Sequence, residues 1–123
     1  MKTNIIVTGG AGYIGSHICK ELKKSNFNPI TYDNLSSGNE RFVKWGPLIK
    51  GSILDKKKLL LTFKKYKPIA VIHLAAKSVV HELEKNQKDC FEVNVNGTIN
   101  LLEAMTISGI NKIIFYSPAS VYG

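Results

Sequence analysis

The chain has 123 residues, a net charge of +8 and 44% hydrophobic residues, which is typical of one globular domain. Its sequence shows neither an apolar run that would span a membrane nor an export leader, so we expect a cytoplasmic protein without a membrane partner. Of its 17 basic residues only Arg41 is an arginine. Because phosphate and base recognition favours the bidentate arginine guanidinium, we expect a solvated basic surface and no nucleic-acid partner.

The first predicted elements are a strand over residues 4–8 and a helix over residues 13–25, joined by a glycine-rich loop. The N–H groups of the helix's first turn and the helix dipole favour an anion at this point. A tight turn without any ligand is the alternative explanation. In the loop sequence Thr8-Gly9-Gly10-Ala11-Gly12-Tyr13-Ile14-Gly15, the first spaced glycine permits a sharp turn, the second lets amides approach a pyrophosphate, and the third allows close helix packing.

The second predicted strand, residues 29–32, ends at Asp33, roughly 20 residues beyond the loop. This is the spacing at which a carboxylate binds the adenine ribose of a dinucleotide. A carboxylate accepts hydrogen bonds from the ribose diol and repels a 2′-phosphate, and no arginine directly follows Asp33. We therefore favour a dinucleotide site over a plain turn, and NAD over NADP.

Strands and helices continue to alternate along the chain, with Asp55 as a predicted helix N-cap. The pattern predicts an α/β fold, a Rossmann-like doubly wound parallel sheet of about five strands in the order 3-2-1-4-5. We expect one partial dinucleotide-binding domain over residues 1–123, with the cofactor crevice at the carboxyl ends of strands one and four. The remaining predicted elements are a loop (35–39), a strand (47–50), a helix (56–66), a strand (70–76), a helix (90–106) and a strand (112–117).

Cysteine and histidine usage predicts no metal or redox site. Cys19 and Cys90 lie far apart and outside any Cys-x-x-Cys pair, so we expect small buried thiols. His73 is expected to be a packed core residue within a strand, and His17 and His81 are expected on exposed helical surface.

Five motifs in order carry a resemblance to the extended short-chain dehydrogenase/reductases, the family of NAD(P)-dependent epimerases and dehydratases. The resemblance covers residues 2–123, but only the first third or so of a typical member. It implies a fold that holds NAD and, in complete nucleotide-sugar epimerases, oxidises the sugar at C4 and returns the hydride to the other face. The motifs are the glycine loop, Asp33-Asn34-Leu35, His73-Leu74-Ala75-Ala76, Asn94-Val95-Asn96-Gly97-Thr98 and Ser120-Val121-Tyr122-Gly123.

The resemblance also implies a set of cofactor-binding residues. Leu74 and Ala75 would pass beneath the nicotinamide, although strand core is an alternative role for both. Asn94 would hydrogen-bond near the catalytic centre, or else satisfy the backbone. The other implied residues are Gly9, Gly12 and Gly15 around the pyrophosphate, Tyr13 and Ile14 as amide donors, Asp33 and Asn34 at the adenosine ribose, and Ile53 against adenine.

Three departures from the family pattern bear on activity. Ser52 stands where the family usually has an aspartate that accepts a hydrogen bond from the adenine amino group, so we expect weakened NAD binding. Pro118 occupies the position of the catalytic Ser or Thr hydroxyl and cannot transfer a proton. No tyrosine is followed by lysine four positions later, so the family's Tyr-x-x-x-Lys base is absent, and we predict no catalytic residues.

The leading hypothesis is a truncated, epimerase-like NAD-binding fragment that is inactive alone and binds no nucleotide sugar without a second domain. One alternative is a split nucleotide-sugar epimerase completed by another chain. Another is a non-catalytic nucleotide-binding or interaction module. An open fifth strand, and a helix resembling one that complete members use for dimerisation, make self-association a further expectation.

Overall fold

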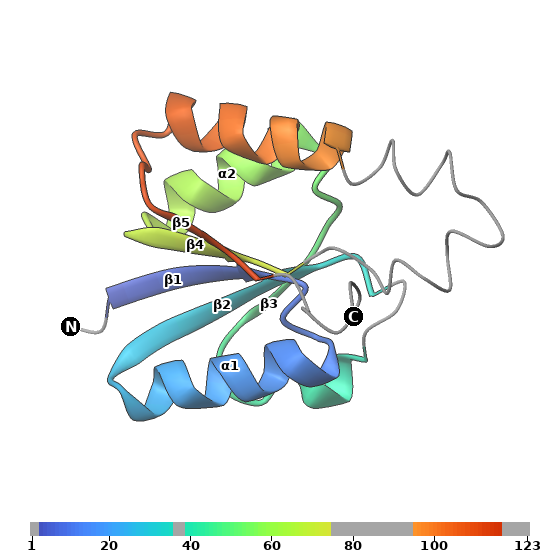
Figure 1. Ribbon diagram of the computed structural model, residues 1–123, viewed down its shortest axis with the longest axis vertical. Helices are drawn as coiled ribbons and strands as arrows, with labels where there is room; N and C mark the ends of the chain where they lie inside the picture. Colours follow the sequence, from blue (N-terminus) through green and yellow to red (C-terminus); the bar gives the residue numbers. More distant parts are fainter. Residues whose placement is uncertain (1–2, 36–38, 75–94, 117–123) are drawn as a thin grey trace, which may run out of the picture.

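The computed structural model describes residues 3–35, 39–74 and 95–116. Its centre is a five-stranded parallel sheet with strand order β3-β2-β1-β4-β5, which confirms the predicted fold class (Figure 1). The strands are β1 (Thr3–Thr8), β2 (Phe27–Asp33), β3 (Leu48–Lys50), β4 (Ala70–His73) and β5 (Ile113–Phe115).

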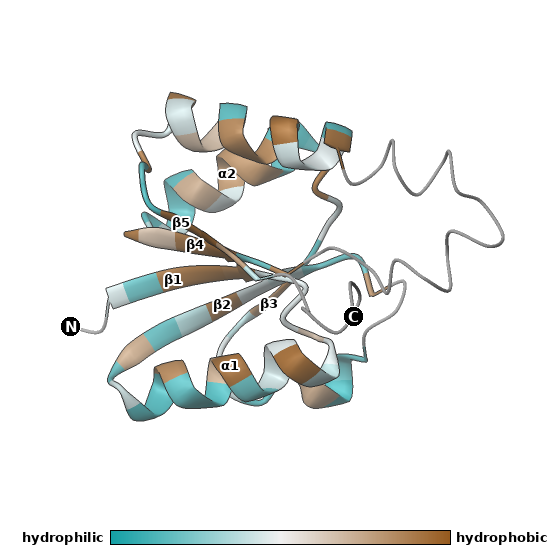
Figure 2. Ribbon diagram, viewed as in Figure 1, coloured by the Kyte–Doolittle hydropathy of each residue, from teal (hydrophilic) through white to brown (hydrophobic). Residues whose placement is uncertain are grey.

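Helices cover both faces of the sheet. Helix α1 (Tyr13–Lys24) lies on one face, and α2 (Lys56–Tyr66) and a helix over residues 95–107 lie on the other (Figure 1). The helices alternate hydrophobic and hydrophilic residues along their length, as helices packed on one side do (Figure 2). Buried side chains form two clusters, one on each face of the sheet. The cluster beneath α2 includes Ile6, Ile30, Phe63, Val71 and Leu101, and the cluster beneath α1 includes Ile5, Val7, Cys19 and Ile72.

Most predicted elements lie within two residues of the observed ones. Helix α2 has the predicted bounds, and Asp55 caps it by accepting a hydrogen bond from the Lys58 N–H at 3.1 Å. Strand β2 begins two residues before the predicted start because Phe27 and Asn28 pair with β1. A short 3₁₀ helix, η1 (Glu40–Phe42), was not predicted and follows a cap by the Asn39 side chain.

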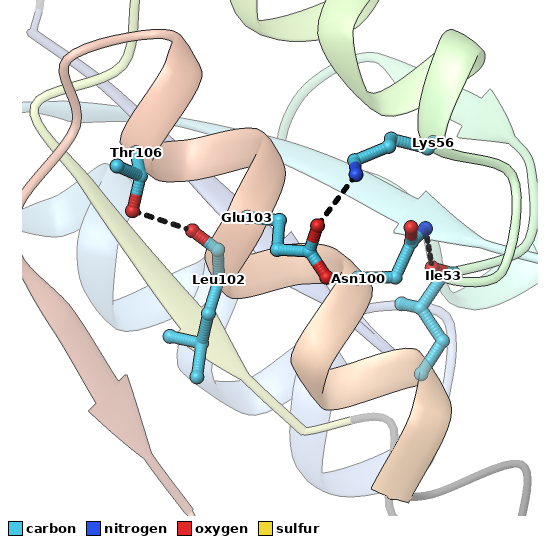
Figure 3. Close-up of polar contacts among 6 residues, drawn as sticks. All are labelled: Ile53, Lys56, Asn100, Leu102, Glu103 and Thr106. Atoms are coloured by element: carbon cyan, nitrogen blue, oxygen red, sulfur yellow. Dashed lines mark hydrogen bonds and ion pairs between the residues drawn. The ribbon is translucent and has the colours of Figure 1, made fainter.

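The helix over residues 95–107 is held against the segment that follows β3 (Figure 3). The Asn100 side chain donates a hydrogen bond to the Ile53 carbonyl at 2.7 Å, and Lys56 pairs with Glu103 at 2.7 Å. A Cβ added at Gly97 would lie 2.3 Å from the end of the Ile53 side chain, so a larger residue there would require that side chain to shift. The contacts fix this helix relative to α2.

Some predictions lie outside the described residues. The first part of the predicted helix over residues 90–106, the end of the strand predicted over 70–76 and the last residue of the strand predicted over 112–117 belong to this group. So do Ala75, His81, Cys90, Asn94 and Pro118. Of the remaining cysteine and histidines, Cys19 and His73 are buried and His17 is exposed, as predicted.

Candidate functional site

The winding direction of the sheet reverses between β1 and β4. These strands pair side by side, yet α1, which follows β1, and the helix over residues 95–107 lie on opposite faces (Figure 1). In doubly wound sheets ligands bind outside the carboxyl ends of the strands at such a switch point. The glycine loop begins at the carboxyl end of β1, so the fold places it at the expected crevice.

Gly9 makes the turn that leads out of β1. Its φ is +78°, a left-handed conformation that disfavours residues with a Cβ. The Gly9 N–H donates to the Tyr32 carbonyl at 2.9 Å, and the Gly9 carbonyl accepts from the Gly12 N–H at 3.2 Å. The loop is thus tied to β2 as well as to β1.

Gly15 allows the first turn of α1 to lie on the loop backbone. A Cβ added there would lie 2.4 Å from the Gly9 carbonyl oxygen and 2.6 Å from the Gly10 Cα, distances that real Cβ atoms do not show. Gly10 is similarly restricted, because its Cβ would lie 2.6 Å from the Thr31 hydroxyl. The protein's own packing therefore accounts for both glycines, and the close approach at Gly15 is to the loop rather than to β1 itself.

Gly12 differs from these glycines because nothing in the described fold requires a missing side chain there. Its φ of −81° is accessible to any residue, and an added Cβ would meet only the Gly9 carbonyl at 3.5 Å, an ordinary contact. Gly12 is the N-cap of α1 without a side-chain hydrogen bond, and the first turn carries no acidic residue. The first N–H groups of a helix lack acceptors within it. The N-terminal turn of α1 at Gly12 therefore forms a cradle of backbone N–H groups that fits an anionic group such as a pyrophosphate.

Tyr13 and Ile14 follow Gly12 in the first turn of α1. Both side chains are exposed, and the Tyr13 ring packs edge-on against His17 at 4.6 Å between ring centroids. Their side chains thus point away from the core, which leaves their backbone N–H groups as the ones able to meet an anion at the loop.

Asp33 lies beside the loop although the two are far apart in sequence. Its Oδ2 accepts a hydrogen bond from the Ala11 N–H at 3.0 Å, and its Oδ1 accepts from the Leu35 N–H at 2.8 Å. Each carboxylate oxygen has a further lone pair, so Asp33 can also accept from ribose hydroxyls. Asn34 follows it directly and is exposed.

Of the residues implied around adenine and nicotinamide, the structure describes Ile53 and Leu74, and both pack against the core. Ile53 is 8% exposed and packs against Gly97, so its place against adenine stays a prediction. Leu74 directly follows β4, is half-buried and packs against the cluster beneath α1, and its place beneath the nicotinamide stays a prediction. The Ser52 hydroxyl accepts from the Leu54 N–H at 3.0 Å.

One group of residues in the site was not predicted from the sequence. His73, at the end of β4, contacts Thr8, at the end of β1, through Nδ1 at 2.6 Å, and Thr98 through Nε2 at 3.2 Å. Burial lowers the pKa of His73 to about 4, so the ring is neutral at neutral pH. Sequence alone marked His73 as core, because the contact joins residues that are distant along the chain. The described residues hold no cluster of His, Cys, Asp or Glu suited to a metal ion.

Together, a doubly wound parallel sheet, a glycine loop at its switch point and a carboxylate at the end of β2 define an α/β protein with the architecture of the Rossmann fold. The sequence profile of the NAD dependent epimerase/dehydratase family matches residues 5–123. The chain belongs to this family, which confirms the resemblance drawn from its motifs.

Relatives within the family are UDP-glucose 4-epimerases. The chain is 46% identical over 122 residues to the enzyme of Rhizobium meliloti (strain 1021), covering 99% of this chain and 37% of the relative. It is 36% identical over 140 residues to the human enzyme, covering 100% of this chain and 39% of the relative. The chain thus spans well under half the length of these relatives.

Solved structures of UDP-glucose 4-epimerases are also similar to this chain. The Brucella ovis UDP-glucose 4-epimerase in complex with NAD superposes with a TM-score of 0.91 at 42% identity, over 98% of this chain and 37% of that one. The Thermotoga maritima enzyme with UDP-glucose superposes with a TM-score of 0.85 at 36% identity, over 95% of this chain and 38% of that one. In the part of the chain that the structure describes, no helix is long and apolar enough to cross a membrane.

Proposed function

We propose that this chain binds NAD at the loop between β1 and α1 and does not epimerise nucleotide sugars by itself. The observation that carries the proposal is the cradle at Gly12, where a Cβ would fit the protein and where glycine therefore keeps space for something outside it. The N-terminus of α1 would hold the pyrophosphate, and Asp33 would bind the adenosine ribose. The similarity to an epimerase solved with NAD supports this assignment.

When bound, NAD supplies a hydride acceptor. The chain's own contribution is to bind and orient the dinucleotide, because the proton-transfer groups of the family are absent from its 123 residues. None of the five tyrosines is followed by lysine four positions later, and the family resemblance implies that Pro118 takes the place of a hydroxyl. We therefore expect binding without turnover.

Two measurements on the purified chain test this proposal. Isothermal titration should show saturable binding of NAD, with NADP weaker because the Asp33 carboxylate repels a 2′-phosphate. An assay for interconversion of UDP-glucose and UDP-galactose should give no rate above a no-enzyme control. Turnover above that control would refute the inactive assignment, and absence of NAD binding would refute the binding assignment.

A second candidate function is that of one part of an assembly, either with a chain that completes the site or with another copy. The exposed side chains of β5 favour it, since Ile114 and Phe115 are 57% and 56% exposed. Beside this strand lies an apolar groove of about 390 Å³ between α1 and Tyr116. Light scattering over a concentration series tests self-association, and a strictly monomeric chain would exclude assembly with another copy.

A further inference from the structure

His73 and its two threonine partners form a polar chain, buried at Thr8 and His73 and half-buried at Thr98, that the proposed function does not use. His73 is 7% exposed and Thr8 is completely buried. The chain links three elements, since Thr8 ends β1, His73 ends β4, and Thr98 lies in the helix over residues 95–107. The His73 ring also packs edge-on against Phe115 of β5, with 5.8 Å between ring centroids.

The hydrogen bonds of Thr8 indicate how the protons are arranged. Its hydroxyl oxygen accepts from the Leu74 N–H at 3.1 Å and lies 2.6 Å from His73 Nδ1. If the Thr8 hydroxyl donates to Nδ1, its proton has an acceptor, and Nε2–H then donates to the Thr98 hydroxyl. We assign this arrangement because the opposite tautomer would leave the buried Thr8 proton without an acceptor among these groups.

Thr8 connects the His73 polar chain to the glycine loop. Thr8 directly precedes Gly9, whose turn carries the loop into α1. Backbone hydrogen bonds hold the point at which the glycine loop leaves the sheet, with the Leu74 N–H on the Thr8 carbonyl and the Gly9 N–H on the Tyr32 carbonyl, both at 2.9 Å. The Thr8 side chain adds its contacts with His73 and the Leu74 N–H at the same point. From this juxtaposition we propose that His73 is a positioning residue that holds the glycine loop in register with the helix over residues 95–107. The proposal deepens the proposed function, because that loop is the site to which NAD binding is assigned.

The test uses variants that change the contact and leave the volume nearly constant. Thr98→Val removes the hydroxyl that His73 contacts, and Thr98→Ser keeps it. Thr106→Val is the matched control on the same helix, because the Thr106 hydroxyl donates to the Leu102 carbonyl at 2.9 Å and lies outside the polar chain (Figure 3). Two quantities are measured: amide hydrogen exchange without ligand, and the NAD dissociation constant under conditions in which every variant is fully folded.

Thr98→Val should increase the exchange rates of the hydrogen-bonded amides of Gly9, Ala11 and Gly12 relative to the wild type. This increase should be at least ten times the increase at any amide of α2. It should also raise the NAD dissociation constant at least fivefold. Thr98→Ser and Thr106→Val should stay within twofold of the wild type in both measurements. Equal acceleration in the loop and in α2, or no acceleration in either, would overturn the inference. Failure of the wild type to bind NAD would instead refute the proposed function, and the exchange measurement would still decide the role of His73.

Discussion

Alanine substitutions at Gly12 and Gly15 separate the glycine that a ligand requires from the glycine that the fold requires. At Gly12 the new methyl group would lie 3.5 Å from its nearest neighbour and the backbone is unstrained, so the free energy of unfolding should change by less than about 1 kcal/mol. A methyl group in the cradle would block approach of a pyrophosphate to the backbone. We expect at least a tenfold rise in the NAD dissociation constant, or about 1.4 kcal/mol.

At Gly15 an alanine should affect the stability of the fold more directly than NAD binding. The methyl group would lie 2.4 Å from the Gly9 carbonyl oxygen, so either the loop or α1 has to move. Overpacking of this kind costs about 1–3 kcal/mol, and the higher helix propensity of alanine offsets up to about 1 kcal/mol of it. With that offset in full, the Gly15→Ala variant should be less stable than the wild type by up to about 2 kcal/mol.

Urea unfolding and isothermal titration with NAD, carried out on both variants, give the two free energies independently. The result that would refute the reasoning is a Gly12→Ala variant that binds NAD as tightly as the wild type. A Gly12→Ala variant destabilised as much as Gly15→Ala would also refute it, because the glycine would then serve the fold.

Three further predictions concern Ser52, Asp33 and His73. Ser52→Asp should lower the NAD dissociation constant by one to two decades, since a charge-assisted hydrogen bond to adenine contributes about 1.5–3 kcal/mol, and a titration showing no gain would contradict this. Asp33→Asn should weaken NAD binding and narrow the preference over NADP, measured by titrating both cofactors; an unchanged ratio would exclude Asp33 from cofactor choice. Stability should fall between pH 6.5 and 4, because the unfolded chain binds a proton at His73 that the folded chain, with a pKa of about 4, does not, and it should be constant in this respect above pH 7. In urea unfolding, the loss in the free energy of unfolding should approach about 3 kcal/mol near pH 4. This loss should be missing in the His73→Phe variant. If that variant shows the same loss at acid pH, groups other than His73 cause it.

The fold could be predicted because local signals and the global pattern agree. Asp55 and the apolar spacing after it mark α2 without help from the rest of the molecule. The start of β2 was missed because Phe27 and Asn28 are strand residues only through their pairing with β1. Asn28 also donates its side-chain amide to Asn4 at 2.8 Å, a contact that no local pattern indicates.

The candidate site could be predicted in its residues and less so in its contacts. The spacing of the glycines and the position of Asp33 follow from sequence, since each lies at a fixed offset from a strand end. The sequence does not show that Gly15 is required by packing while Gly12 is not, because this depends on where neighbouring backbone atoms lie. The contacts of His73 likewise depend on tertiary structure.

The most direct test of the central claim is an amide chemical-shift titration of the whole chain with NAD. We predict saturable shifts centred on the amides of residues 9–15 and on Asp33 and Leu35, where the loop meets the end of β2. Shifts centred on the basic surface of α2, or no saturable shifts at millimolar NAD, would contradict the assignment of this loop as a dinucleotide site.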